Sequence, residues 1–187
     1  MLARAEALEQ LKGFFESNGV RYMIIGGLAN TVWGRPRLTY DADVKVVLGE
    51  LSIGEFGRMA GWSFAFRRPD AIEFARQNYV LLIHVTNEVP ADLIIGLLPY
   101  ENQAIERAVP VDIEGVVMPV CTAEDLIVHK AISERERDWL DIEGILLRQR
   151  DALDQEYVED WLLEFASGLG RPQIVDRYHE LRGRLDV

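Results

Sequence analysis

A segment close to the N-terminus constrains the fold most, because two strand-like runs flank a pair of glycines. Val20 to Ile25 is an apolar run rich in β-forming residues, and Gly26-Gly27 ends it. Leu28 to Trp33 is compatible with one or two helical turns, and Thr39 to Val47 alternates polar and apolar residues. The sequence therefore predicts a strand, a tight turn, a short helix and a second strand.

Two acidic residues, Asp41 and Asp43, lie in the second of these strands. Residues two positions apart on a strand point to the same face, so both carboxylates share one side with Lys45. Carboxylates this close repel each other unless a cation lies between them. Mg²⁺ is the natural cation because it prefers oxygen ligands and leaves positions for water and phosphate, and Mn²⁺ is an alternative. An Asp-x-Asp pair alone is more often just the polar face of a half-buried strand.

The rest of the chain predicts an α+β fold, with a mixed β-sheet, flanking helices and a helical C-terminal third. Helices are expected at Leu2 to Ser17, Ile53 to Ala60 and Asp70 to Gln77, a strand at Trp62 to Phe66, and hairpins of Tyr79 to Thr86 with Ala91 to Ile95 and of Val109 to Ile113 with Val116 to Val120. Thr122 to Asp125 matches a capping box, so a long helix is expected from Asp125, with later breaks around Gln149 to Leu153 and Ser167 to Pro172. We expect residues 1–121 to form a catalytic core and residues 122–187 a helical region packed on it, together one compact unit.

Composition excludes some classes of function. The formal charge of −11 over 187 residues weighs against a dedicated nucleic-acid binder, although Arg67 and Arg68 form one of several local basic pairs. Apolar runs such as Tyr79 to Val85 are too short to cross a bilayer, so we expect a cytoplasmic protein without membrane contact. The single cysteine, Cys121, cannot form an internal disulfide or a thiolate metal site.

A third acid, Asp92, is placed by the predicted hairpin early in its second strand. The Gly26-Gly27 pair, the run Arg37-x-Thr39-x-Asp41-x-Asp43 and this downstream aspartate occur together over a stretch from Val20 to about Leu147. In this combination the chain resembles the polymerase-beta-like nucleotidyltransferases. Within them it is most similar to a small bacterial branch that includes abortive-infection toxins and antibiotic nucleotidyltransferases.

The resemblance implies a role for each of these residues. Gly26 and Gly27 would hold a nucleoside triphosphate through backbone amides at a helix start. Asp41 and Asp43 would bind the metal, and Asp92 would complete a second metal position or accept the proton of the acceptor hydroxyl. Arg37 and Thr39 would contact phosphate or orient Asp41, with an ordinary edge-strand role as the alternative.

A second cluster begins at Lys130. Asp138 and Asp141 follow it by eight and eleven residues, so on one continuous helix the three would share a side. A lysine followed by an Arg-x-x-Asp-x-x-Asp run again resembles the family. It implies that Lys130 neutralises nucleotide phosphates, with Arg135 supporting it or pairing with Asp138. The alternative is a solvated helix face with internal ion pairs.

The expected activity is transfer of a nucleoside monophosphate from a nucleoside triphosphate to a hydroxyl, with release of pyrophosphate. The acceptor is a tRNA, a small molecule or a protein, and the residues do not distinguish these. A non-catalytic nucleotide sensor or a toxin–antitoxin partner is the alternative, with homo-oligomerisation equally open. An Asp-x-Asp glycosyltransferase fits less well, because the glycine pair so close to the acids is unexplained by it.

Overall fold

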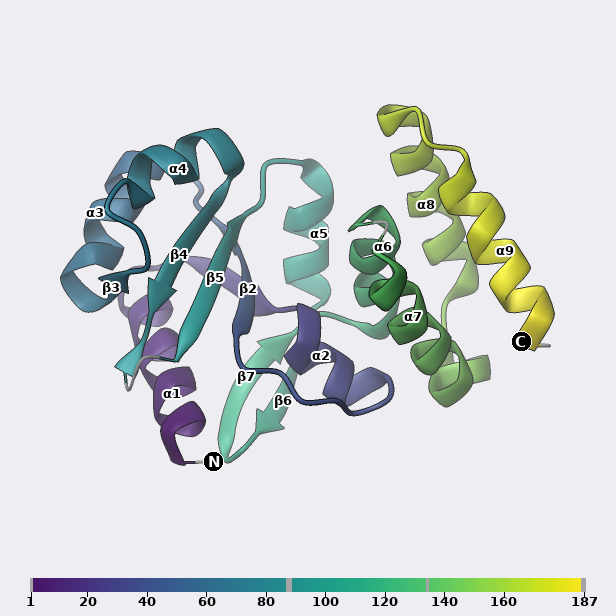
Figure 1. Cartoon of the computed structure of the whole chain (residues 1–187), viewed down its shortest axis with the longest axis horizontal. Coiled ribbons are helices and arrows are strands. Elements are labelled where there is room, and N and C mark those ends of the chain that lie inside the picture. The colour runs from purple at the N-terminus through teal and green to yellow at the C-terminus, as the bar shows by residue number, and fades with distance from the viewer. Residues whose placement is uncertain (1, 87–88, 134, 186–187) are drawn as a thin grey trace. The chain divides into compact units, whose positions relative to one another are not determined.

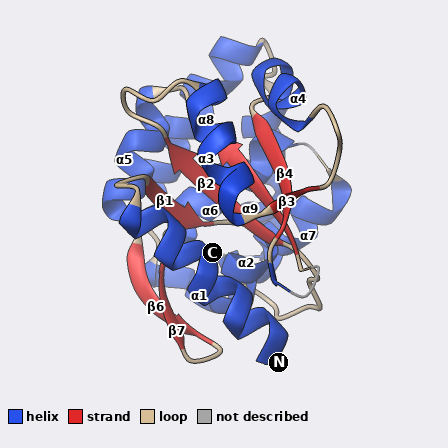
Figure 2. Cartoon of the chain, turned by 90° about the vertical axis from the view of Figure 1, so that its left-hand side faces the viewer, coloured by secondary structure: helices blue, strands red, loops and turns tan. Residues whose placement is uncertain are grey.

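The computed structural model describes residues 2–86, 89–133 and 135–185. Within these residues, one mixed sheet has the strand order β3-β4-β5-β2-β1-β7-β6 (Figures 1 and 2). Its strands are β1 (Arg21–Ile24), β2 (Ala42–Val47), β3 (Ala65–Phe66), β4 (Val80–His84), β5 (Pro90–Ile95), β6 (Val109–Ile113) and β7 (Val116–Val120). The helices around and after the sheet are α1 (Leu2–Ser17), α2 (Gly26–Trp33), α3 (Ile53–Ser63), α4 (Ala71–Asn78), α5 (Pro99–Arg107), α6 (Ala123–Ser133), α7 (Glu136–Gln149), η2 (Arg150–Ala152), α8 (Gln155–Leu169) and α9 (Gln173–Leu185).

Two parallel strand pairs lie at the centre of this sheet. β2 pairs with β5 and β1 pairs with β7 in parallel, whereas the β1–β2, β3–β4, β4–β5 and β6–β7 pairs are antiparallel. The α+β class with a mixed sheet is therefore confirmed. Parallel neighbours require a long crossover, so β2 and β5 bring together residues that are about 50 positions apart in the chain.

Helices cover both faces of the sheet. Tyr22 and Val46 are register partners on one face, where the ring of Phe15 in α1 stacks on Tyr22 with 4.4 Å between centroids. Phe14 of α1 in turn contacts Phe56 of α3. The opposite face carries α5 (Figure 1). Glu101 of α5 pairs with the buried Lys45 of β2 at 3.5 Å. Asp43 precedes Lys45 by two residues and therefore faces the same way.

Most of the local predictions hold. The helix at Leu2–Ser17 and the hairpin of β6 with β7 have the predicted bounds, and β4 with β5 forms the other predicted hairpin. The second strand is shorter than predicted, because it starts at Ala42. The strand expected at Trp62 to Phe66 is wrong in its first half, since α3 continues through Ser63 and leaves the Trp62 side chain 85% exposed. α5 is not among the predicted elements.

The helical region after the sheet contains one break that was not predicted from the sequence. Asp125 N donates to Thr122 Oγ1 at 3.2 Å, so the predicted cap of α6 is confirmed. The predicted long helix, however, ends at Ser133, and α7 begins at Glu136. Ser133 Oγ donates to the carbonyl of Lys130 and to Asp138, which offers the backbone an alternative to further helix turns. Lys130 is therefore not on the same helix as Asp138 and Asp141.

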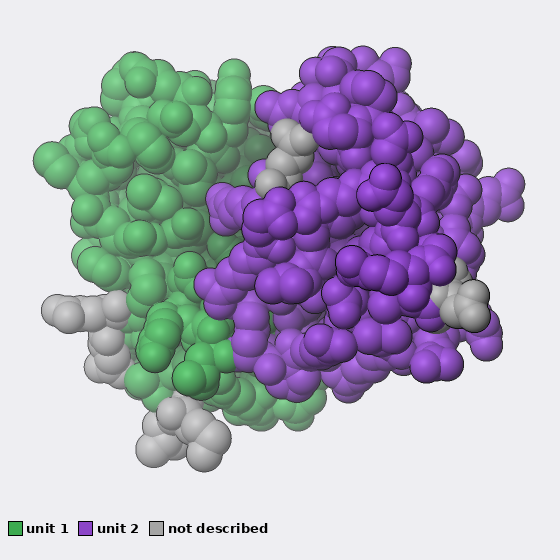
Figure 3. Space-filling view, turned by 45° about the vertical axis from the view of Figure 1, so that its right-hand side comes forward, with its two compact units in different colours: residues 1–28, 38–121 green, residues 29–37, 122–187 purple. Residues whose placement is uncertain are grey.

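The chain divides into two compact units, which Figure 3 distinguishes by colour. The first comprises residues 1–28 and 38–121, and contains the sheet. The second comprises residues 29–37 and 122–187, in which α6 contacts α7, α8 and α9. No helix in the described part of the chain is long and apolar enough to span a membrane.

Candidate active site

The predicted acids of the first unit meet where β2 and β5 run side by side. Asp43 and Asp92 are register partners in this parallel pair, so their side chains leave the sheet on the same face. Asp41 lies one residue before the start of β2, and its charge acts on Asp92. The structure thus brings together three carboxylates that the sequence separates by up to 51 positions.

The start of α2 lies against this row of acids. Gly26 has a φ of +61°, and a Cβ atom built on it would lie 1.9 Å from Asp43 Oδ2. A Cβ on Gly27 would lie 2.6 Å from Thr39 Oγ1, while Gly27 N donates a long hydrogen bond of 3.4 Å to Asp43 Oδ2. Side chains at either position would therefore clash, and the glycines let a helix N-terminus approach a carboxylate.

Thr39 forms a hydrogen bond with Asp41, the first of the three acids. Its Oγ1 donates to Asp41 Oδ1 at 2.8 Å, and its side chain is almost fully buried. Arg4 of α1 donates to the Thr39 carbonyl at 3.1 Å, which anchors this stretch of backbone from the other side. The hydroxyl thus holds the Asp41 carboxylate from within the same segment.

Arg67 is a further residue at the acids, and it is not among the site residues predicted from the sequence. Its Nη1 lies 2.5 Å from Asp92 Oδ1. Burial raises the pKa of Asp92 above its ordinary value, the Arg67 guanidinium opposes this shift, and the Asp41 carboxylate adds to it. The basic pair at 67 and 68, directly after a predicted strand, is the one sequence signal for this residue.

These residues fit a divalent cation in their chemistry. Asp43 and Asp92 are carboxylates on one face with Asp41 just before β2, and oxygen ligands of this kind suit Mg²⁺ or Mn²⁺. The glycines at the start of α2 allow its backbone to approach Asp43 and Thr39, where any Cβ would clash. Within the described residues, no three acidic, histidine or cysteine side chains converge closely enough to hold a metal. Asp92 is engaged with Arg67 and Asp43 with Gly27, so a cation would require side-chain rearrangement.

The second unit holds the cluster around Lys130, joined across the α6–α7 turn. Lys130 Nζ lies 2.6 Å from Asp141 Oδ2 and 3.0 Å from Asp138 Oδ1, and the lysine is only 4% exposed. Arg37 Nη2 lies 3.2 Å from the same Asp141 oxygen, and Asn30 donates to its other oxygen. Asp141 therefore gathers donors from α2, from the segment after it and from α6.

Burial raises the pKa of Asp138, but the hydrogen bond from Ser133 and the charges of Lys130 and Arg135 outweigh it, so the net pKa lies below its ordinary value. Arg135 precedes α7 and acts on Asp138 through its charge. Of the residues predicted to bind nucleotide, Gly26, Gly27 and Thr39 belong to the first unit, and Arg37, Lys130 and Arg135 belong to the second.

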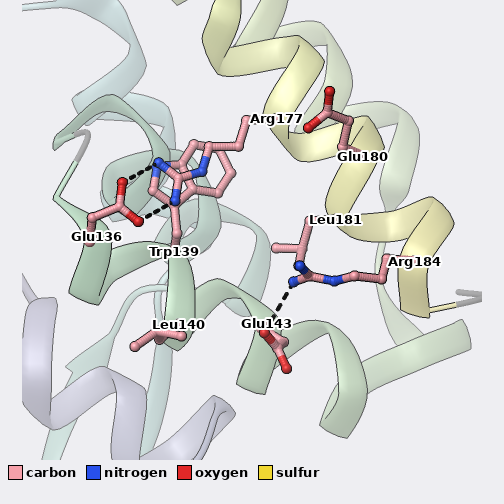
Figure 4. Close-up of a pocket in the computed structure, with 8 residues that line it drawn as sticks. All are labelled: Glu136, Trp139, Leu140, Glu143, Arg177, Glu180, Leu181 and Arg184. Carbon is pink, nitrogen blue, oxygen red and sulfur yellow. Dashed lines mark hydrogen bonds and ion pairs between the residues drawn. The ribbon is translucent and has the colours of Figure 1, made fainter.

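A hollow of about 390 Å³ lies between α7 and α9 of the second unit. Ion pairs cross it: Arg177 binds both oxygens of Glu136 while its guanidinium stacks over Trp139, and Arg184 pairs with Glu143 (Figure 4). Both arginines that line the hollow are thus already paired with glutamates of α7. This hollow contains none of the residues predicted from the sequence to bind nucleotide or metal.

Comparison with solved structures identifies the fold. A nucleotidyltransferase-like antigenic protein from Paracoccidioides brasiliensis aligns with a TM-score of 0.52 and 16% identity, over 94% of this chain and 91% of that one. The antibiotic-resistance factor ANT(2'')-Ia aligns with a TM-score of 0.56 and 16% identity, over 93% of this chain and 95% of that one. No curated protein matches the sequence.

A family model matches residues 4–167, which include the sheet, its three acids and the cluster around Lys130. That family is described as "Nucleotidyl transferase of unknown function (DUF2204)". Because this match spans most of its length, the chain belongs to this family of nucleotidyl transferases.

Proposed function

We propose that the protein transfers a nucleoside monophosphate from a nucleoside triphosphate to a hydroxyl group, with release of pyrophosphate. The observation that carries this proposal is the register pairing of Asp43 with Asp92, with Asp41 just before β2 and the start of α2 against Asp43. A pure binding module needs an anion cradle but has no need of a third acid. The nucleotidyltransferase-like fold supports the same class of reaction.

The residues of the first unit have distinct tasks in this reaction. Backbone amides at Gly26 and Gly27 bind phosphate oxygens, helped by the positive end of α2. Asp41, oriented by Thr39, and Asp43 are the ligands proposed for Mg²⁺ or Mn²⁺. A divalent cation bound there would neutralise charge on the triphosphate and on the departing pyrophosphate. Asp92 either joins these ligands or accepts the proton from the acceptor hydroxyl.

The acceptor is proposed only as a class, namely a hydroxyl on a small molecule, a tRNA or a protein. The formal charge of −11 favours a small molecule or a protein over a polyanionic RNA. ANT(2'')-Ia, an antibiotic-resistance factor, shares the fold at 16% identity, which makes hydroxylated antibiotics reasonable first candidates. A non-catalytic sensor or a toxin–antitoxin partner remains the second candidate function.

The test is label transfer from each α-labelled nucleoside triphosphate with Mg²⁺ or Mn²⁺, using a panel of hydroxylated antibiotics, tRNA and protein. The double variant Asp41→Asn, Asp43→Asn is the inactive form, and Glu50→Gln, an exposed acid of the same unit, is the matched control. Transfer that persists in the double variant rejects the site. Triphosphate binding without transfer to any acceptor supports the sensor instead.

A further inference from the structure

Arg67 and Asp92 belong to one row of residues that runs across the sheet. Arg67 N donates to the carbonyl of Leu82 on β4 at 3.0 Å, and Leu82 is the register partner of Asp92. Asp92 is in turn the partner of Asp43. Residues directly opposite each other across a sheet share a face, so the Arg67 side chain extends over β4 and reaches the acids from the outer side.

The ion pair involves Asp92, the third carboxylate of the proposed metal site. Arg67 Nη1 and Asp92 Oδ1 are 2.5 Å apart, with the two side chains 32% and 28% exposed. A guanidinium stays protonated and offers only donors, so it repels a cation at the carboxylate to which it donates. A cation that binds this carboxylate therefore competes with the positive charge of Arg67.

Arg68 provides an internal comparison. It also pairs with an aspartate, Asp70, but the partner is two residues away and the pair lies on the surface. Exposed pairs of this local kind contribute little to stability or to function. The Arg67 pair instead joins residues 25 positions apart and ends on a half-buried carboxylate beside two other acids.

We propose that Arg67 is a positioning residue that holds Asp92 as an internal counter-ion and that a divalent cation completes its site in competition with this guanidinium. The inference rests on the proposed function, because it assumes that Asp41, Asp43 and Asp92 bind the metal. Arg67 then lowers the affinity of the protein for the metal alone. It also offsets the repulsion that Asp92 experiences from the neighbouring acids without a metal.

The test measures Mn²⁺ binding without nucleotide, from the electron paramagnetic resonance signal of free Mn²⁺. Arg67→Gln should bind Mn²⁺ about tenfold more tightly than the wild type, since a charge-assisted hydrogen bond no longer competes. Arg67→Lys keeps the positive charge and should remain close to the wild type. Arg68→Gln, which removes a neighbouring charge that does not contact the acids, is the matched control and should leave the affinity unchanged.

A second variant pair separates local competition from a general charge effect. With Asp92→Asn in the background, adding Arg67→Gln should no longer change the Mn²⁺ affinity. If Arg67→Gln leaves or weakens Mn²⁺ binding while Asp41→Asn with Asp43→Asn abolishes it, the metal site stands and the role of Arg67 is rejected. If the wild type and Arg67→Gln show no Mn²⁺ binding that depends on Asp41 and Asp43, the proposed metal site fails, and the inference fails with it.

Discussion

Asp43 of β2 and Asp92 of β5 lie directly opposite each other on adjacent parallel strands, with Asp41 just before the start of β2. Like charges that face each other across neighbouring strands destabilise a sheet. Such an arrangement costs stability unless a bound cation or a counter-ion offsets it. Substitution of one of these acids should therefore lower activity and raise stability together.

Asp43→Asn tests this relationship. Without divalent cations, the free energy of unfolding should rise by about 0.5 kcal/mol because one facing charge is removed. Nucleotidyl transfer should fall by at least about 100-fold, the usual effect of removing a group that stabilises transition-state charge. Urea unfolding and label transfer measure the two effects. Asp160→Asn, an exposed acid of α8, should change neither, and a loss of stability in Asp43→Asn would contradict the repulsion.

Gly26→Ala tests the close approach of α2 to Asp43. The new Cβ would enter the space of Asp43 Oδ2 at a positive φ, so we expect a loss of at least about 2 kcal/mol in unfolding free energy. Gly19→Ala has a φ of +63° but open space around it, and should cost only about 1 kcal/mol. Gly13→Ala in α1 should stabilise slightly. Equal losses at Gly26 and Gly19 would show that the clash is relieved.

Lys130→Met tests the buried cluster of the second unit. Removing the ammonium leaves Asp138 without its lysine and Asp141 with Arg37 and Asn30, and we expect a destabilisation of about 3 kcal/mol. Adding Asp138→Asn should recover part of the loss, because fewer buried charges remain uncompensated. Urea unfolding of both single variants and the double variant measures this coupling. Strictly additive effects would mean that Lys130 and Asp138 do not stabilise each other.

The lowered pKa of Asp138 predicts how the stability of the protein depends on pH. The pKa of Asp138 in the folded state lies below the unfolded value of about 3.9. Its contribution to the free energy of unfolding is therefore complete above about pH 3.9 and is lost as the pH falls through the folded-state pKa. The difference in unfolding free energy between the wild type and Asp138→Asn should therefore shrink on acidification. Ser133→Ala should reduce this pH dependence by removing a hydrogen bond that favours the carboxylate. A pH-independent difference would refute the assignment.

Sequence patterns identified the elements that depend on contacts close along the chain. The helix at Leu2–Ser17 and the hairpin turning at Glu114-Gly115 follow from local periodicity and turn chemistry, and both have the predicted bounds. The capping box at Thr122 also involves only neighbouring residues. Local patterns did not predict the end of α6, where Ser133 forms side-chain hydrogen bonds that compete with continuation of the helix.

By itself, then, the sequence determined that Asp43 and Lys45 share a strand face behind a pair of glycines, because that depends only on the alternation of side chains. Asp41, predicted on the same face, lies just before the strand begins. The partners of these residues were decided by tertiary structure. Parallel pairing sets Asp92 opposite Asp43, and the β3–β4–β5 order brings Arg67 to Asp92. Such pairings depend on strand order and on crossovers between distant segments, and no local pattern in the chain encodes them.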